Sequence, residues 1–111
     1  MSEPESVLLV LTTLPATADG VAWARPLVEA RLAACVSVVP GVTSVYWWQE
    51  AVTADQEQQI VIKTTADRLD AVRTWLAGHH PYEVPELLVL PVADGGEAYL
   101  RWIGASTRDA S

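Results

Sequence analysis

The chain has 111 residues, half of them apolar, and a formal charge of −7 at pH 7. This length suits one domain spanning 1–111, and the apolar content excludes intrinsic disorder. The acidic balance argues against a nucleic-acid partner, and no apolar run approaches the roughly 18 residues of a membrane helix. Cys35 is the only cysteine and the N-terminus is acidic. We therefore expect a cytoplasmic protein without a membrane partner.

The first third of the chain predicts a strand followed by a helix. Val7 to Leu11 is a continuous apolar run, as expected of a central strand buried on both faces. Thr17 to Gly20 offers N-cap residues for a helix that continues to about Ala33. Pro26 lies inside that helix and should bend its axis. The face predicted to point inward consists of Val21, Ala24, Val28 and Leu32.

The middle of the chain predicts two long strands. Cys35 to Trp48 is strand-like and is interrupted once, by Pro40-Gly41. Because strand character resumes at Val42, this pair indicates a bulge and not a hairpin turn. A turn near Ala51 to Asp55 then leads into a second strand, Gln56 to Thr65.

The last third predicts a helix, a strand and a final helix. Thr64 or Thr65 caps a helix from Ala66 to about Gly78. Val84 to Val92 follows as an apolar strand, and Asp94-Gly95-Gly96 opens the last helix. The side chains predicted to face inward from the first of these helices are Leu69, Val72 and Leu76.

The order of elements is β-α-β-β-α-β with an extra C-terminal helix, which predicts a ferredoxin-like α+β fold with a long middle hairpin. Two helices cover one face of such a sheet, and the other face should alternate apolar and polar residues. Here it does not, because Tyr46, Trp47 and Trp48 put large aromatic side chains on both faces of a strand. We expect these three residues to anchor an interface between identical chains.

His79 and His80 are the most chemically suggestive pair, because histidine is the commonest metal ligand. Pro81 favours an extended conformation at His80, so the two side chains should point apart. A metal site would then need carboxylates such as Glu83 or Glu86, or residues of a neighbouring subunit. The alternative is that both histidines help to end the helix near Gly78.

Other candidate sites are weaker. Lys63 ends a strand beside a helix N-terminus, where an anion could bind. Glu83 and Glu86 flank Pro85 and either bind cations or are merely solvated. Cys35 follows an apolar run and is expected to be a buried, unreactive thiol. The sequence contains none of the common catalytic patterns (Ser-His-Asp, HExxH or CxxC), so we expect no enzymatic activity.

Four separated blocks of this sequence resemble the CutA family of divalent-cation tolerance proteins, from about Val7 to Trp102. The resemblance implies a cytoplasmic ferredoxin-like trimer, similar to the PII signalling proteins, that is linked to copper and other divalent metals. It also implies that His79 and His80 take part in metal binding. A cysteine that some members carry is Thr12 here, which removes the softest ligand and should weaken copper binding. The blocks are 30–36, 40–48, 62–65 and 79–86.

The sequence is compatible with three functions. The first is a trimeric, non-enzymatic protein that binds copper or other divalent metal ions. The second is a PII-like signalling or scaffold trimer that binds a small anionic ligand or a partner protein in clefts between subunits, with Lys63 as a candidate contact. The third is an enzyme whose site assembles only across the subunit interface.

Overall fold

The computed structural model describes residues 6–108. Its elements follow the predicted order, with a four-stranded antiparallel sheet in the strand order β2-β3-β1-β4. The ferredoxin-like α+β prediction is therefore confirmed. The elements are β1 (Val7–Pro15), α1 (Gly20–Glu29), β2 (Cys35–Trp48), β3 (Ala51–Thr65), a short 3₁₀ helix (Ala66–Arg68), α2 (Leu69–His79), β4 (Leu88–Pro91) and α3 (Glu97–Ser106).

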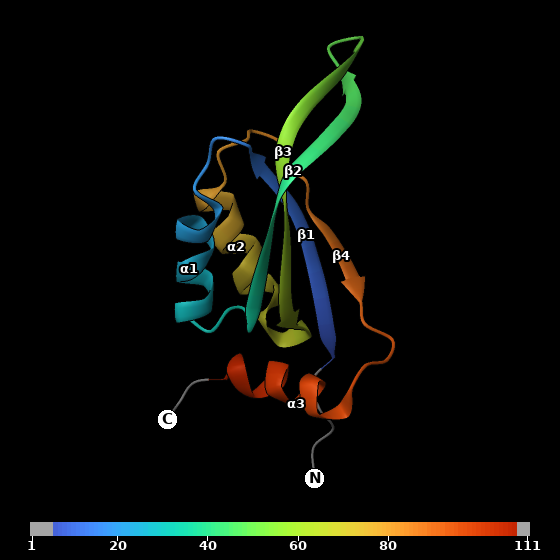
Figure 1. Cartoon of the computed structure of the whole chain (residues 1–111). Helices are drawn as coiled ribbons and strands as arrows, with labels where there is room; N and C mark the ends of the chain where they lie inside the picture. The colour runs from blue at the N-terminus through green and yellow to red at the C-terminus, as the bar shows by residue number, and fades with distance from the viewer. Residues whose placement is uncertain (1–5, 109–111) are drawn as a thin grey trace.

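Helices α1 and α2 lie side by side on one face of the sheet, and α3 crosses its lower end (Figure 1). The β2–β3 hairpin extends well beyond the helices, as its length predicts, so the molecule measures 53 × 26 × 22 Å. Each helix that the structure describes is too short or too polar to cross a lipid bilayer.

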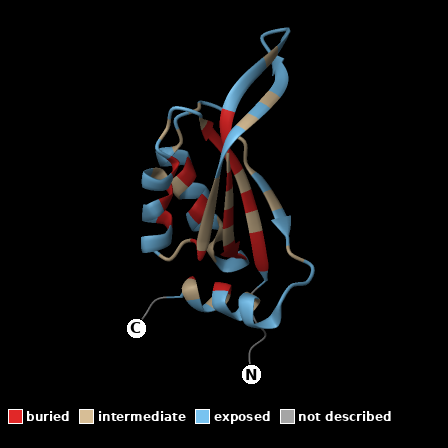
Figure 2. Cartoon of the chain, in the orientation of Figure 1, coloured by how far each residue is buried: buried red, intermediate tan, exposed pale blue. Residues whose placement is uncertain are grey.

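The main core lies between the sheet and the two helices (Figure 2). Val10 of β1 and Ile60 and Ile62 of β3 are fully buried there against Leu27 of α1 and Val72 of α2. Burying one such side chain contributes about 1.5–3 kcal/mol to stability. Leu76 is also buried and Leu69 packs against this core, so the predicted inner face of α2 is confirmed.

The inner face of α1 differs from the prediction. Ala24 is buried as expected, but the second buried anchor is Leu27, whereas Val21 is 60% and Val28 is 39% exposed. The helix also ends at Glu29, four residues before the expected end. Arg31 adopts a left-handed conformation with φ of 59°, which stops the helix and turns the chain toward β2.

The predicted bulge in β2 is confirmed, because the register against β3 shifts between Val39 and Val42. Gly41 has φ of 74° there, a conformation that suits glycine. The predicted hairpin turn at Ala51 to Asp55 is wrong. The chain reverses at Gln49 and Glu50, both with positive φ, and β3 starts at Ala51. Neither residue is Asn or Gly, so the usual sequence pattern of a two-residue turn is missing.

Strand β4 is shorter than the predicted Val84 to Val92. Only Leu88–Pro91 pairs with β1, and Val84 is 84% exposed in the irregular segment that follows α2. Pro85 accounts for this near the expected start, since proline lacks the N–H that a strand ladder requires.

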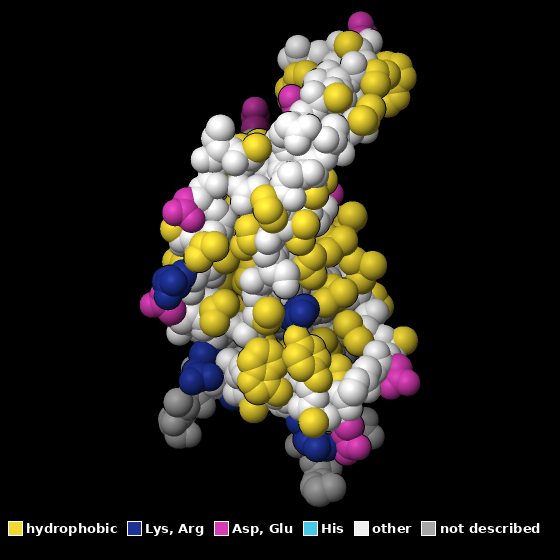
Figure 3. Space-filling view, in the orientation of Figure 1, with side chains coloured by type: hydrophobic (Ala, Val, Ile, Leu, Met, Phe, Trp, Pro, Cys, Tyr) yellow, Lys and Arg dark blue, Asp and Glu magenta, His cyan; other side chains and the backbone are white. Residues whose placement is uncertain are grey.

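Within residues 6–108, the face of the sheet opposite α1 and α2 is covered only at its lower end, by α3. Val39 of β2 is 45% exposed, and Leu88 and Leu90 of β4 are 55% and 42% exposed. Apolar side chains cover much of the surface in this view (Figure 3). Cys35 was predicted to be buried but is only partly so, because it lies on this open face opposite Lys63.

Candidate functional site

The ring of His80 is hydrogen-bonded on both sides. Its Nδ1 accepts the backbone N–H of Tyr82 at 3.1 Å, which leaves the proton on Nε2. That Nε2 lies 2.8 Å from the carbonyl oxygen of Thr13 and 3.0 Å from Oγ1 of Thr12. Burial lowers the pKa of His80 below its ordinary value, so the ring is held neutral.

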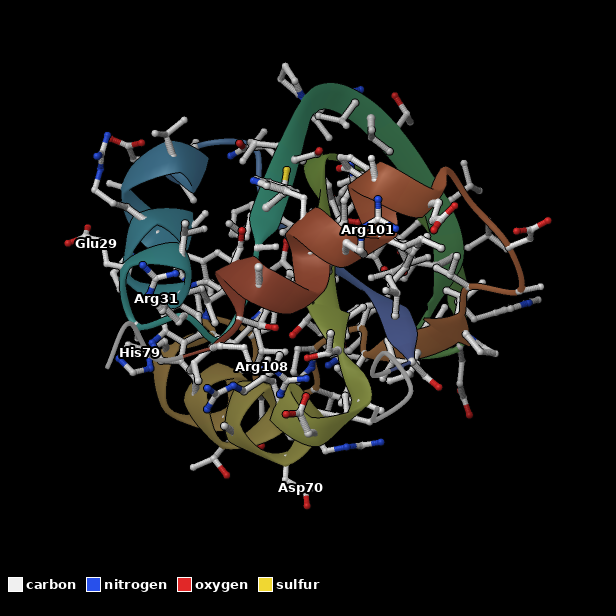
Figure 4. All side chains as sticks on the ribbon, turned by 90° about the horizontal axis from the view of Figure 1, so that it is seen from below. Glu29, Arg31, Asp70, His79, Arg101 and Arg108 are labelled. Carbon is white, nitrogen blue, oxygen red and sulfur yellow. The ribbon has the colours of Figure 1, made fainter. Side chains whose placement is uncertain are left out.

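His79 lies at the end of α2 and is exposed, with its ring pointing away from the core (Figure 4). Its Nδ1 lies 2.8 Å from the carbonyl oxygen of Trp75, which can only accept, so Nδ1 carries the proton. The imidazole stacks on the Trp75 ring at 4.2 Å. Its Nε2 makes no hydrogen bond within the described part of the chain.

The two histidines therefore have different partners, one on α2 and the other at the end of β1. Thr12 is in direct contact with His80. Among the residues that the structure describes, His, Cys, Asp and Glu form no group of three or more that could hold a metal ion. The described part of one chain thus offers a single uncommitted imidazole nitrogen and no complete coordination shell, which does not fit a tight metal site.

A groove of about 800 Å³ lies between the β2–β3 hairpin, the end of β1 and the segment that follows α2. Two of the predicted site residues, Glu83 and Glu86, line it on one side. Tyr46 and Trp48, predicted as interface anchors, line it on the hairpin side. The third predicted anchor, Trp47, is not among the lining residues and is 74% exposed.

Two tyrosines hold carboxylates in this groove. The hydroxyl of Tyr82 donates to Glu57 at 2.8 Å, and that of Tyr46 donates to Asp55. Burial, followed by the hydrogen bond to Glu57, raises the pKa of Tyr82 well above its ordinary value. The hydrogen bond to Asp55 raises the pKa of Tyr46 in the same direction. Both tyrosines therefore remain neutral donors to these carboxylates.

Sequence reasoning did not single out Asp55, Glu57 or Tyr82. Asp55 and Glu57 are two residues apart on β3, so both side chains project from the same face of the strand. The sequence feature that could have identified them is this alternation of acidic residues in β3, which follows the aromatic run of β2 closely along the chain.

Lys63 does not join the other candidate residues. It lies at the far end of β3, where its Nζ donates to the hydroxyl of Tyr99 on α3 at 3.1 Å. This hydrogen bond raises the pKa of Lys63 above its ordinary value. The structure thus separates the predicted anion contact at Lys63 from the acidic groove at Glu83 and Glu86.

The family model described as CutA1 divalent ion tolerance protein matches residues 8–106. The divalent-cation tolerance protein CutA of Yersinia pestis (strain Pestoides F) is 40% identical over 111 residues, which cover 96% of this chain and 93% of that protein. The structure of CutA1 from Oryza sativa superposes with a TM-score of 0.90 at 38% identity, covering 98% of this chain and 100% of that one. A structure described as the periplasmic divalent cation tolerance protein CutA from Archaeoglobus fulgidus has a TM-score of 0.85 at 27% identity and covers 92% and 99% of the two chains.

Proposed function

This chain belongs to the CutA1 family of divalent ion tolerance proteins, and from that premise we propose that it is a non-enzymatic homotrimer that binds copper or other divalent metal ions in the response to those ions. The observation that carries the proposal is the family match over residues 8–106, nearly the whole chain. It relates residues 8–106, and not one motif, to a family described by its tolerance of divalent ions.

The open face of the sheet supports self-association. The exposed Leu88 and Leu90 of β4 pair with the partly exposed Leu11 and Leu9 of β1. The exposed Val39 of β2 lies on the same face of the sheet. An apolar surface of this kind is a liability in a monomer, and closed association of identical chains is the usual way to cover it. The exposed Trp47 and Trp48 on the hairpin supply large anchors for the same purpose.

The metal-binding step is best supported at the histidine pair. His79 keeps Nε2 uncommitted, while a metal at His80 would have to displace the hydrogen bond to Tyr82 or the contact with Thr13. Since one chain provides too few ligands, further donors would come from neighbouring subunits or from water. We expect weak binding of copper(II) or zinc, which falls as the pH drops below about 6.5 because imidazole binds metal only when neutral.

The test is calorimetric titration of the unmodified protein with copper(II) and zinc, alongside His79→Ala, His80→Ala and the double variant. The proposal expects the double variant to lose most of the binding, with His79→Ala alone accounting for the larger share. Trp75→Leu, which removes the stacking partner of His79 without removing a ligand, is the matched control and should bind nearly as well. Equal affinity of the unmodified protein and the double variant would place the metal elsewhere.

The alternative of a small anionic ligand has no specific observation in its favour. The groove at the hairpin is lined by Asp55, Glu57, Glu83 and Glu86, which repel anions. Lys63, the predicted anion contact, already donates to Tyr99. We therefore retain the metal-binding role as the proposed function and assign no enzymatic activity.

We place this function in the cytoplasm. The support is the lone Cys35, which suits a reducing compartment. Fractionation of cells that produce the full chain, with a periplasmic or secreted marker as the reference, checks this placement.

A further inference from the structure

We infer that the connection between β4 and α3 is a site of spontaneous backbone modification, at which Asp94 cyclises onto Gly95 and reopens in part as isoaspartate. The connection covers residues 92–96, which form neither helix nor strand, and it runs along the outside of the molecule (Figure 1). Asp94, Gly95 and Gly96 are all exposed. This inference goes beyond metal binding and does not depend on it.

The backbone nitrogen of Gly95 already lies against the side chain that it would attack. Its N–H donates to Oδ1 of Asp94 at 2.8 Å, and this is its only hydrogen bond within residues 6–108. The carboxyl carbon bonded to that oxygen is therefore within close reach of the nitrogen. Reacting groups held together in this way react much faster than groups that move freely. Glycine also leaves the approach open, because it has no side chain to shield its nitrogen.

The reaction is the loss and the regain of one water molecule. A bond forms between the Gly95 nitrogen and Cγ of Asp94, and the bond from Cγ to the hydroxyl oxygen of the protonated carboxyl breaks. That hydroxyl leaves as water with the proton of the nitrogen, and a five-membered succinimide ring remains. Water then opens the ring at one of its two carbonyl carbons. Attack at Cγ restores aspartate, whereas attack at the main-chain carbonyl leaves isoaspartate, in which the backbone runs through Cβ and Cγ.

The chain contains a second Ala-Asp-Gly sequence, which the fold protects. Residues 18–20 and 93–95 have the same three amino acids. Asp19 is the N-cap of α1, and its Oδ1 accepts the backbone N–H of Ala22 at 3.0 Å. Gly20 is buried, and a Cβ there would lie 2.7 Å from side chains of both β2 and β3. Ring closure requires both residues to change conformation, so this packing resists it.

Isoaspartate before Gly95 changes the start of α3, because it adds a methylene group to the backbone. Gly95 lies so close to Leu100 that a Cβ on Gly95 would be 3.1 Å from Cδ2 of Leu100. Leu100 in turn packs against the smaller core cluster, which consists of Val7, Ala34 and Ile103. We therefore expect the longer backbone to disturb this contact and to loosen the docking of α3 on the lower end of the sheet.

The test is prolonged incubation of the full chain at physiological temperature and mildly acidic pH, where the carboxyl can carry the proton that leaves with water. Trypsin then releases peptides 74–101 and 1–31, because Pro26 blocks cleavage after Arg25, and each peptide contains one aspartate. Mass spectrometry with electron-transfer fragmentation measures isoaspartate in each. We expect it to accumulate at least about tenfold faster at Asp94 than at Asp19. Incubation in water labelled with heavy oxygen should label peptide 74–101 in the same proportion.

Hydrogen exchange tests the consequence for the fold. In the fraction that contains isoaspartate, the amides of α3 should exchange faster than in the unmodified protein, while those of α1 should not change. Unchanged exchange in α3 would overturn the predicted loosening.

Two comparisons separate the effect of the fold from that of the local sequence. In denaturing urea the two Ala-Asp-Gly sequences should form isoaspartate at similar rates, because the contacts that distinguish them are lost. Gly95→Ala should slow the reaction at Asp94 at least about tenfold by shielding the nitrogen, whereas Gly96→Ala, one residue further on, should change it less than about twofold. Equal rates at Asp94 and Asp19 in the folded chain, or an unchanged rate in Gly95→Ala, would each overturn the inference.

Discussion

The hydroxyl of Tyr82 donates to Oε2 of Glu57 at 2.8 Å, and this hydrogen bond joins the segment after α2 to strand β3. Glu57 is only 9% exposed, so its carboxylate depends on this donor for part of the solvation it has lost. The irregular segment that carries Glu83 and Glu86 is thereby held against the hairpin, and the groove between them takes its shape.

Replacing Tyr82 with phenylalanine should lower the free energy of unfolding by about 1.5–3 kcal/mol, because it leaves a buried charged acceptor without its donor. Tyr99→Phe is the matched control, since the hydroxyl of Tyr99 serves the exposed end of Lys63 and its loss should matter by less than about 1 kcal/mol. Urea unfolding at one fixed protomer concentration measures both variants. Similar losses in the two would show that the Tyr82–Glu57 contact carries little energy.

Stability should depend on pH through His80. Its pKa in the folded chain lies below the ordinary value of 6.5, so the unfolded chain binds more protons below about pH 6.5. The free energy of unfolding should therefore fall as the pH drops below that value, and level off once the folded-state pKa is passed. Urea unfolding at a series of pH values in the presence of a chelator measures this slope.

The variants His80→Gln and His79→Gln identify which histidine causes this pH dependence of stability. The first removes the buried imidazole and should flatten the dependence between about pH 5 and pH 7, where histidine titrates. The second removes the exposed ring at the end of α2 and should leave the slope in place. If the pH dependence persists in His80→Gln, other titratable groups cause it.

The exposed tryptophans of the hairpin should matter for assembly. Trp47→Ser/Trp48→Ser removes two anchors of the proposed trimer, each worth about 1.5–3 kcal/mol when fully buried. In sedimentation velocity the unmodified chain should run as a trimer at micromolar concentration and the double variant as smaller species or aggregates. Val21→Ser, which removes an exposed apolar side chain from α1, should leave the trimer intact. A monomeric unmodified chain would contradict the proposal.

The hairpin turn carries backbone strain that can be relieved. Gln49 and Glu50 have φ of 47° and 65°, a region that favours asparagine and glycine. Gln49→Asn/Glu50→Gly should raise the free energy of unfolding by about 1 kcal/mol. Glu29→Gly, the same change in the last turn of α1, should instead lower it by up to about 1 kcal/mol. Thermal unfolding of both variants distinguishes relief of strain from a general effect of glycine.

The architecture could be predicted from the sequence because its features are local. The apolar run at Val7, the Asp19 cap of α1 and the Pro40-Gly41 bulge each depend on neighbouring residues. The predicted cap at Thr64 or Thr65 is wrong, because Thr65 makes no capping hydrogen bond through its side chain and α2 starts only at Leu69, after a short 3₁₀ turn. The errors have local causes as well. The turn at Gln49 lacks the usual turn residues, and the early end of α1 depends on a left-handed Arg31 that no sequence rule for this residue type predicts.

The sequence by itself determined the order of the elements, the excess of acid over base and the place of the histidines at a helix end. Only the tertiary structure decided what those residues contact. His80 faces Thr12 and Thr13 across 68 and 67 residues, and Tyr82 reaches Glu57 across 25. Such contacts follow from the docking of α2 and its following segment onto β1 and β3. Periodicity within one element cannot specify them, because it describes a face and not the element that packs against it.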